Sequence, residues 1–391
     1  TDEVFDVLDV PGKIYFAIEF LPGQYDQRAD SVEQCLTLLT GNEAVKIKSG
    51  KVFVFEGITF DELSKIKAYL INPIECREKN LDLPLAIDAA IAPKTVEIYE
   101  GFITFSAAQL DEFLTEKGMA MTLADLIFIK DYFRDVEKRN PSDTELKVLD
   151  TYWSDHCRHT TFETVIKSVA FEEGKFQESL QNAFSTYLNM RKVTHRNQKN
   201  MTLMDMATIN AREARQFGLL EDLEITDEIN ACSIYIDVDV DGKKEPWLLM
   251  FKNETHNHPT EIEPFGGAST CIGGAIRDPL SGRSYVYQAM RISGGANILE
   301  PIEATRTGKL AQKLISKNSA RGNSSYGNQI GLATSFVREL YHPGFKAKHL
   351  ETGAVVAAAP VANVRRDSSD PGDKIILLGG ATGRDGIGGA T

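Results

Sequence analysis

The sequence lacks the marks of a membrane, secreted or nucleic-acid-binding protein. None of its apolar runs reaches the ~18 residues that a transmembrane helix needs. Residues 1–9 carry four acidic side chains and no basic one, so no signal peptide is visible there. Asp and Glu outnumber Lys and Arg by 56 to 43, and no basic stripe is present. We therefore expect a cytoplasmic protein that binds neither nucleic acid nor membrane. With a formal net charge of -13, it needs a local cluster of donors for any anionic substrate.

Cysteine is scarce and unpaired. The five cysteines lie far apart and form no Cys-X-X-Cys pair, so we expect reduced thiols in a cytosolic protein rather than disulfides. The chain has no initiator methionine and ends within a glycine-rich stretch. We expect it to be a fragment cut at both ends.

The N-terminal part predicts a small α+β module. The length of 391 residues, with 42% hydrophobic and 25% charged side chains, indicates two or three globular domains. Strand and helix patterns alternate in the order β-α-β-α, which is typical of a ferredoxin-like or similar module. The predicted elements are strands over 13–20, 51–56 and 95–99, a helix through Cys35 with Ser31 as its N-cap, and a helix opened by Thr59 or Asp61.

A helical region follows. Residues 106–139 have helical patterning, which Asn140-Pro141 interrupts. Ser142 and Glu145 form a capping-box pattern that opens another helix. That helix carries Leu146, Leu149 and Trp153 on one apolar stripe, which reaches His156. Residues 162–227 look helical and polar.

Beyond Asn230 the hydrophobic period changes to two, which predicts strands. Residues 233–240 alternate strictly, Asp241-Gly242 predicts a hairpin turn, and 246–252 predicts the return strand. Further expected elements are a helix over 309–317 and buried strands over 354–359 and 374–378.

The return strand is followed by a polar segment whose side chains could bind a ligand or take part in catalysis. In extended geometry, Lys252, Glu254, His256 and His258 share one face. They supply a cation for phosphate, a hard carboxylate ligand and two imidazoles. Pro259 cannot donate to a central ladder, so strand pairing should fail near it and expose this end. The plainer alternative is a solvated strand end.

A second cluster lies at the end of the predicted helix that carries Trp153. His156 and His159 are about a helical turn apart, flanked by Asp155 and Arg158. One alternative is a helix C-terminus decorated with His and Arg, which the helix dipole favours. Another is a zinc site that combines these histidines with His256 and His258. Zinc would not explain the nearby lysine or the glycine-rich segment that follows.

That glycine-rich segment covers 266–278 and ends in Arg277-Asp278. We expect a loop, because glycines let backbone N–H groups approach phosphate oxygens closely. Arg277 can fork onto a phosphate or carboxylate, and Asp278 suits Mg²⁺. A second glycine run, 379–389, is either another phosphate cradle or a tight strand-to-helix connection.

Together these motifs resemble phosphoribosylformylglycinamidine synthase, the glutamine-dependent ligase of purine synthesis, in its large single-chain form. The family's Ser-Glu-His-Cys motif resembles residues 154–157, with Asp155 in place of Glu. Its Glu-Thr/Ser-His-Asn-His-Pro motif resembles 254–259. Its glycine-rich Arg-Asp motif resembles 267–278, with Cys271 where glycine is usual. The segment 20–30 resembles the N-terminal module of the large form.

The resemblance implies roles residue by residue. His156 and His256 match catalytic histidines, with His256 as proton acceptor. Glu254 and Asp278 match Mg²⁺ ligands. Contacts to ATP are implied for Lys252, His159, Gly267, Ala268, Thr270, Gly273 and Gly274, and contacts to formylglycinamide ribonucleotide for Thr255, His256, Asn257, His258 and Arg277.

The resemblance also implies a domain plan. Residues 1–105 would be a small-subunit-like α+β module, and 106–160 a helical linker. Residues 161–344 would be the complete first half of a domain similar to aminoimidazole ribonucleotide synthetase, and 345–391 the truncated start of its second half.

The implied partners are ATP, Mg²⁺, formylglycinamide ribonucleotide and the remainder of the same polypeptide. Ammonia would come from a glutaminase domain that this sequence does not show. Two other hypotheses stay open: a zinc hydrolase built on the four histidines, and a non-catalytic binding or assembly module.

Overall fold

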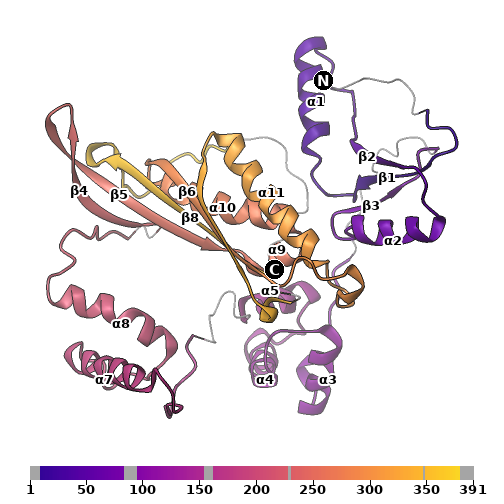
Figure 1. Ribbon diagram of the computed structural model, residues 1–391. Helices are drawn as coiled ribbons and strands as arrows, with labels where there is room; N and C mark the ends of the chain where they lie inside the picture. The colour runs from indigo at the N-terminus through magenta and orange to yellow at the C-terminus, as the bar shows by residue number, and fades with distance from the viewer. Residues whose placement is uncertain (1–8, 83–94, 154–161, 228–229, 347, 379–391) are drawn as a thin grey trace. The chain divides into compact units, whose positions relative to one another are not determined.

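A computed structural model of the chain describes residues 9–82, 95–153, 162–227, 230–346 and 348–378. The chain divides into two compact units (Figure 1). One combines Thr1–Ala90 with Asp222–Thr391, and the other is Ile91–Glu221. This division by compactness differs from the four expected domains, whose boundaries stay a prediction.

The first unit begins with the expected α+β module. A three-stranded antiparallel sheet in the order β2-β1-β3 packs Phe16 and Ile18 against Leu63 and Cys76. The α+β prediction is therefore confirmed. The elements are β1 (Ile14–Phe20), α1 (Gln27–Thr40), β2 (Gly50–Phe55), α2 (Phe60–Leu70) and β3 (Cys76–Lys79).

Two details of the module were predicted wrongly. The third strand is β3, not residues 95–99, because Glu97 and Tyr99 form backbone hydrogen bonds with Asp143 and Pro141 instead of joining the sheet. The N-cap of α1 is Asp26, whose side chain accepts the N–H of Ala29, so Ser31 lies inside the helix. The prediction of Thr59 as the cap of α2 is confirmed, with Glu62 completing a capping box.

The second unit is helical, as expected. Phe102, Leu110, Leu126 and Leu146 are fully buried in a core formed by residues between 99 and 153. The Ser142–Glu145 capping box forms with both backbone N–H groups satisfied. Its elements are η1 (Phe102–Thr104), α3 (Ala107–Lys117), α4 (Leu123–Tyr132), η2 (Phe133–Glu137), α5 (Asp143–Trp153), α7 (Gln177–Val193) and α8 (Leu203–Gln216).

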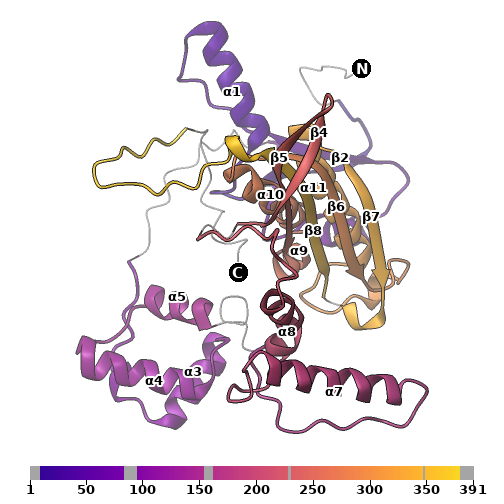
Figure 2. The ribbon, with the colours of Figure 1, turned by 90° about the vertical axis from the view of Figure 1, so that its left-hand side faces the viewer.

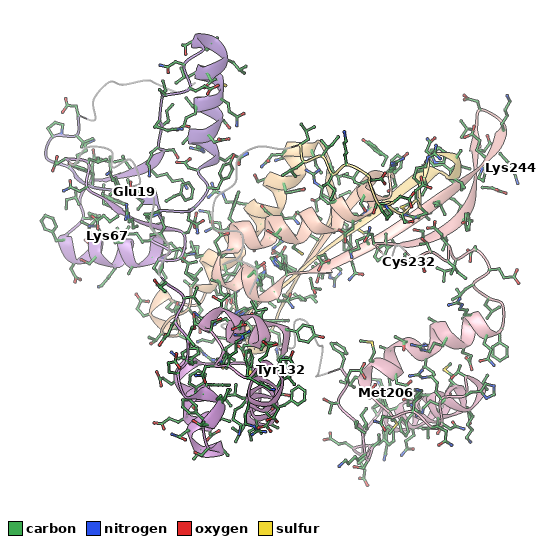
Figure 3. All side chains as sticks on the ribbon, turned by 180° about the vertical axis from the view of Figure 1, so that it is seen from behind. Glu19, Lys67, Tyr132, Met206, Cys232 and Lys244 are labelled. Atoms are coloured by element: carbon green, nitrogen blue, oxygen red, sulfur yellow. The ribbon has the colours of Figure 1, made fainter. Side chains whose placement is uncertain are left out.

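A five-stranded sheet in the order β4-β5-β8-β6-β7 dominates the first unit. All neighbours are antiparallel except β6 and β7. Asp241 and Gly242 turn β4 into β5 with positive φ of 53° and 81°, as a two-residue type I′ hairpin requires. Figure 3 labels Cys232 at the start of β4 and Lys244 near the hairpin tip. The strands are β4 (Cys232–Val240), β5 (Lys243–Thr255), β6 (Tyr285–Gly295), β7 (Thr334–Tyr341) and β8 (Leu350–Pro360).

Helices α10 (Pro264–Ser281) and α11 (Gln312–Ile330) cover one face of this sheet (Figures 1 and 2). The buried stripe of α10 recurs at helical spacing and meets small and branched side chains of β5, β6 and β8. These core residues are Leu248, Met250, Ile272, Ala275, Ile276, Val286, Ala289, Val355 and Ala357. Short elements complete the unit: α9 (Asn257–Ile262), η3 (Ile302–Ala304), η4 (Pro343–Phe345) and η5 (Val361–Asn363).

Three further expectations need correction or completion. The predicted helix over 309–317 is α11, which begins later and runs much further. Residues 374–378 are not a strand, and the side chains from Ile375 to Leu378 are fully exposed because no described strand pairs with them. The glycine run 379–389 lies outside the described residues. No helix in the described ranges has both the length and the apolarity for crossing a membrane.

Candidate functional site

The end of β5 and the helix α10 run antiparallel and in step. Lys252 reaches Asp278, Glu254 reaches Gly274, and His256 reaches Gly267. Between Lys252 and Glu254, two strand residues advance ~6.6 Å while the four helical residues from Gly274 to Asp278 advance ~6 Å, so these two side chains meet successive helical turns. His256, beyond the end of β5, contacts a carbonyl seven residues before Gly274 and does not continue this register. The polar face predicted from the two-residue period is therefore confirmed for Lys252 and Glu254, and it lies toward α10.

Three charged groups meet where the end of β5 contacts the C-terminal part of α10. Lys252 Nζ lies 2.8 Å from Asp278 Oδ2 and 3.7 Å from Glu254 Oε2. The hydrogen bond with Asp278 raises the pKa of Lys252, so its ammonium stays charged at neutral pH. Each side chain is 22–41% exposed, which leaves the cluster accessible to a ligand.

The donor set of this cluster fits Mg²⁺. This ion is commonly held by one or two carboxylates together with substrate phosphates, and Glu254 and Asp278 already share one cation, the Lys252 ammonium. The zinc hypothesis also requires His156 and His159, which lie outside the described residues, so it stays an untested prediction. Among the described residues no three His, Cys, Asp or Glu side chains come together as a metal site.

His256 follows the end of β5 and occupies the N-cap position of α9. Its backbone N–H donates to the carbonyl of Glu351, and its Nδ1 lies 2.9 Å from the carbonyl oxygen of Gly267. A carbonyl oxygen only accepts, so Nδ1 must carry the proton and a neutral ring has an acceptor at Nε2. Neighbouring Asn257 accepts the N–H of Glu351 on its Oδ1 at 2.9 Å.

His258 does not continue the extended face, and that part of the prediction was wrong. β5 ends at Thr255, and Asn257–Ile262 forms the short helix α9, in which Pro259 is tolerated because it sits in the first turn. The ring of His258 turns to Glu261, with Nδ1 3.1 Å from Oε1.

The glycine-rich segment is not the expected loop, because it lies within α10. Gly267, Ala268 and Gly273 are buried in helix packing, while Thr270 is exposed and Gly274 half-buried. Glu263 caps the first turn by accepting the N–H groups of Phe265 and Gly266, so those donors are already used. The implied ATP contacts of these residues stay predictions.

The glycines of α10 serve close packing. A Cβ on Gly267 would lie 2.5 Å from Thr260 Cα, and one on Gly273 would lie 2.8 Å from the ring of Tyr326. The ring of Tyr326 thus lies against α10, where its hydroxyl accepts Nε–H of Arg277 at 2.8 Å. Tyr326 orients Arg277, a role that the sequence did not suggest.

Cys271, where the family usually has glycine, is a buried helix residue. It is 1% exposed, and its Sγ donates to the carbonyl of Glu254 at 3.3 Å. Burial raises the pKa of the thiol to about 12. The helix accommodates the extra Cβ, and the thiol is not a nucleophile at neutral pH.

A buried polar network behind the site was also missed. Arg291 on β6 forms two hydrogen bonds with Glu351 on β8, at 2.6 and 2.8 Å, and both side chains are at most 3% exposed. His349 Nε2 lies 2.8 Å from Glu351 Oε2. The backbone of Glu351 bonds both His256 and Asn257, so this network fixes the position of the His-Asn-His motif.

His156 and His159, with the rest of the cluster over 154–157, lie outside the described residues. Their predicted roles stay predictions. Of the other cysteines in the described ranges, Cys35 and Cys232 are exposed and Cys76 is buried, and none forms a disulfide.

A family model described as the formylglycinamide ribonucleotide amidotransferase linker domain matches residues 110–159. The match falls within the region expected to be a helical linker. It covers α4 and α5 and the greater part of α3.

Curated relatives match a longer part. Phosphoribosylformylglycinamidine synthase subunit PurL of Picrophilus torridus is 27% identical over 275 residues, which is 70% of this chain and 29% of that protein. The same subunit of Methanothermobacter thermautotrophicus is 35% identical over 147 residues, 37% of this chain and 19% of that protein.

Among solved structures, T. maritima PurL complexed with AMPPCP is 26% identical, with a TM-score of 0.30 over 42% of this chain and 23% of that one. The chain spans less than a third of the length of the first curated relatives that it matches. The family model and the sequence relatives confirm the resemblance: the chain is similar to phosphoribosylformylglycinamidine synthase over part of that enzyme's length.

Proposed function

We propose that this chain carries part of the synthetase site of phosphoribosylformylglycinamidine synthase, acting in cytoplasmic purine synthesis. In this proposal it binds Mg²⁺-ATP and formylglycinamide ribonucleotide, and ammonia reaches it from a glutaminase. The observation that carries the proposal is the meeting of Lys252, Glu254 and Asp278 beside the His-Asn-His motif.

The reaction replaces an amide oxygen by nitrogen. An amide is a poor electrophile, so its oxygen first takes the γ-phosphoryl group of ATP while the amide N–H loses its proton, giving an iminophosphate and ADP. Ammonia then adds to the carbon, and inorganic phosphate leaves with the former amide oxygen. Positioning and charge neutralisation do most of the work in such phosphoryl transfers.

Each residue of the site has a part in this chemistry. Glu254 and Asp278 would hold Mg²⁺, which when bound neutralises phosphate charge. Once the two carboxylates have that partner, the Lys252 ammonium is available to phosphate oxygens. Arg277, oriented by Tyr326, suits an anionic or carbonyl group of the ribonucleotide.

His256 is the proposed proton acceptor. The Gly267 carbonyl holds its ring with Nδ1 protonated, which directs the basic Nε2 away from α10. The buried Arg291–Glu351 pair supports the backbone that carries this histidine. Ring orientation and tautomer are thus set before substrate binds.

Calorimetric titration with formylglycinamide ribonucleotide tests the proposal. The chain should bind it, and Asn257→Ala and Arg277→Met should each weaken binding by about tenfold, the effect of one lost charged or multiple hydrogen bond. Arg338→Met, on an exposed position of β7, is the matched control and should bind as the unaltered chain does. A folded chain that shows no binding, or equal binding by all variants, contradicts the proposal.

A further inference from the structure

The carboxylate of Glu261 in α9 is a buried point on which three basic side chains converge. Its Oε1 lies 3.1 Å from His258 Nδ1, 3.1 Å from Lys309 Nζ and 3.3 Å from Lys348 Nζ. The glutamate side chain is only 2% exposed, while the histidine and the two lysines are 36–65% exposed. The basic groups therefore have one side toward Glu261 and the other toward solvent.

The charges of this cluster do not balance. Two lysine ammonium groups share one carboxylate oxygen, and His258 adds a third positive group whenever it is protonated. One lysine would neutralise Glu261, so the second leaves the cluster with a net positive charge, and a further anion would offset the repulsion between the two ammonium groups. In a chain with a formal net charge of -13, such a concentration of positive charge favours an anionic ligand.

The cluster is continuous with the predicted substrate motif. His258 belongs to the His-Asn-His segment, and Lys309 and Lys348 arrive from two other segments, before α11 and before β8. A ribonucleotide held by that motif carries a phosphate monoester, the most highly charged group of the molecule.

We propose that His258, Lys309 and Lys348, held together by Glu261, form a subsite for a phosphate monoester, the 5-phosphate of the substrate ribonucleotide. This inference rests on the proposed function and adds to it the residues that recognise the phosphate. Glu261 is a positioning residue here, because it gathers the cations and does not itself face the ligand.

Phosphorus NMR of ribose 5-phosphate titrated with the 391-residue chain tests the subsite. Lys348→Met and Lys309→Met should each weaken binding about tenfold, the value of one charge-assisted hydrogen bond. Lys346→Met is the matched control, since Lys346 lies in the same segment but pairs with Glu300 at 2.6 Å. It should bind as the unaltered chain does, and ribose without phosphate should not bind.

Different results would contradict different parts of the proposal. Absence of ribose 5-phosphate binding, or equal binding by the Lys309→Met/Lys348→Met double variant, overturns the subsite. Displacement of ribose 5-phosphate by Mg²⁺-AMPPCP would assign the cluster to nucleotide phosphates instead and overturn the ribonucleotide assignment. Because Lys348 is 65% exposed, its replacement leaves folding intact, and circular dichroism checks this. If ribose 5-phosphate binds as expected while formylglycinamide ribonucleotide does not, the subsite stands and the proposed function fails.

Discussion

The ammonium of Lys252 lies 2.8 Å from the carboxylate of Asp278, and this pair joins the end of β5 to the last turn of α10. Glu254, one strand step further on, faces the same helix at Gly274. Two residues of a strand and four residues of a helix span nearly the same distance. The contacts between β5 and α10 therefore bring a cation and two carboxylates to one accessible point. Other features of the site depend on how these contacts are supported.

Removing the hydroxyl of Tyr326 should weaken substrate binding without disturbing the fold. In Tyr326→Phe, Arg277 loses the acceptor at 2.8 Å that orients its guanidinium. A hydrogen bond with a charged partner contributes about 1.5–3 kcal/mol, so the affinity should fall by about tenfold or more. Titration with formylglycinamide ribonucleotide measures the loss, and Tyr287→Phe, on an exposed position of β6, serves as the control. Unchanged affinity in Tyr326→Phe would show that Arg277 does not depend on this contact.

Breaking the buried Arg291–Glu351 pair should lower the free energy of unfolding substantially. Arg291→Met leaves the fully buried carboxylate of Glu351 without its main partner, a loss of about 3–5 kcal/mol in the free energy of unfolding. Replacing both residues by apolar ones should recover part of that loss, because no charge is then left unpaired. Urea denaturation provides the measurement, with Arg338→Met as the exposed control. A cost of less than about 1 kcal/mol for Arg291→Met would contradict the assigned role of the pair.

Stability should fall as pH rises through the titration range of Glu263. Burial raises the pKa of this α10 cap to about 7 from an ordinary value of 4.5, so the native state holds a proton that the unfolded state releases. The contribution is fully present below about pH 4.5 and is lost as pH approaches and passes 7. Glu263→Gln keeps a side-chain acceptor for the cap and should flatten this part of the pH profile of the melting temperature. An identical profile in the variant would mean that Glu263 titrates normally.

Thiol labelling should separate the described cysteines by burial. Cys35 and Cys232 are exposed, whereas Cys271 is 1% exposed with a pKa raised to about 12 by burial. Maleimide reacts with thiolates, so the folded chain at pH 8 should be modified at the first two positions and not at Cys271. Peptide mass spectrometry identifies the sites, and a denatured sample shows that all can react. Labelling of Cys271 as fast as Cys35 would contradict its packing within α10.

Much of this site could be predicted because the sequence patterns that specify it are local. The two-residue period that aligns Leu248 and Met250 in the core also aligns Lys252 and Glu254, so the polar face needs no tertiary information. The Asp241-Gly242 turn and the Ser142–Glu145 capping box are likewise short-range patterns with one favoured geometry.

Other features depended on tertiary contacts that local patterns do not show. Glycine costs about 1 kcal/mol in a helix, so the segment 266–278 favours a loop until the close approach of Thr260 and Tyr326 is known. The partners of Glu351 and Glu261 lie on distant segments, which only the strand order brings together. Charge alone therefore could not indicate that Arg291 is structural while Lys348 is placed for a ligand.

The most direct test of the account is calorimetric titration of the chain with ATP, with and without Mg²⁺. The account predicts Mg²⁺-dependent binding that Asp278→Asn and Lys252→Met each weaken by about tenfold or more, as expected for a lost charged contact to phosphate or metal. Asp237→Asn, on an exposed position of β4, should retain full binding. Binding of equal strength in the presence of EDTA, or undiminished binding by Asp278→Asn, would contradict the assignment of Lys252, Glu254 and Asp278 as the Mg²⁺-ATP site.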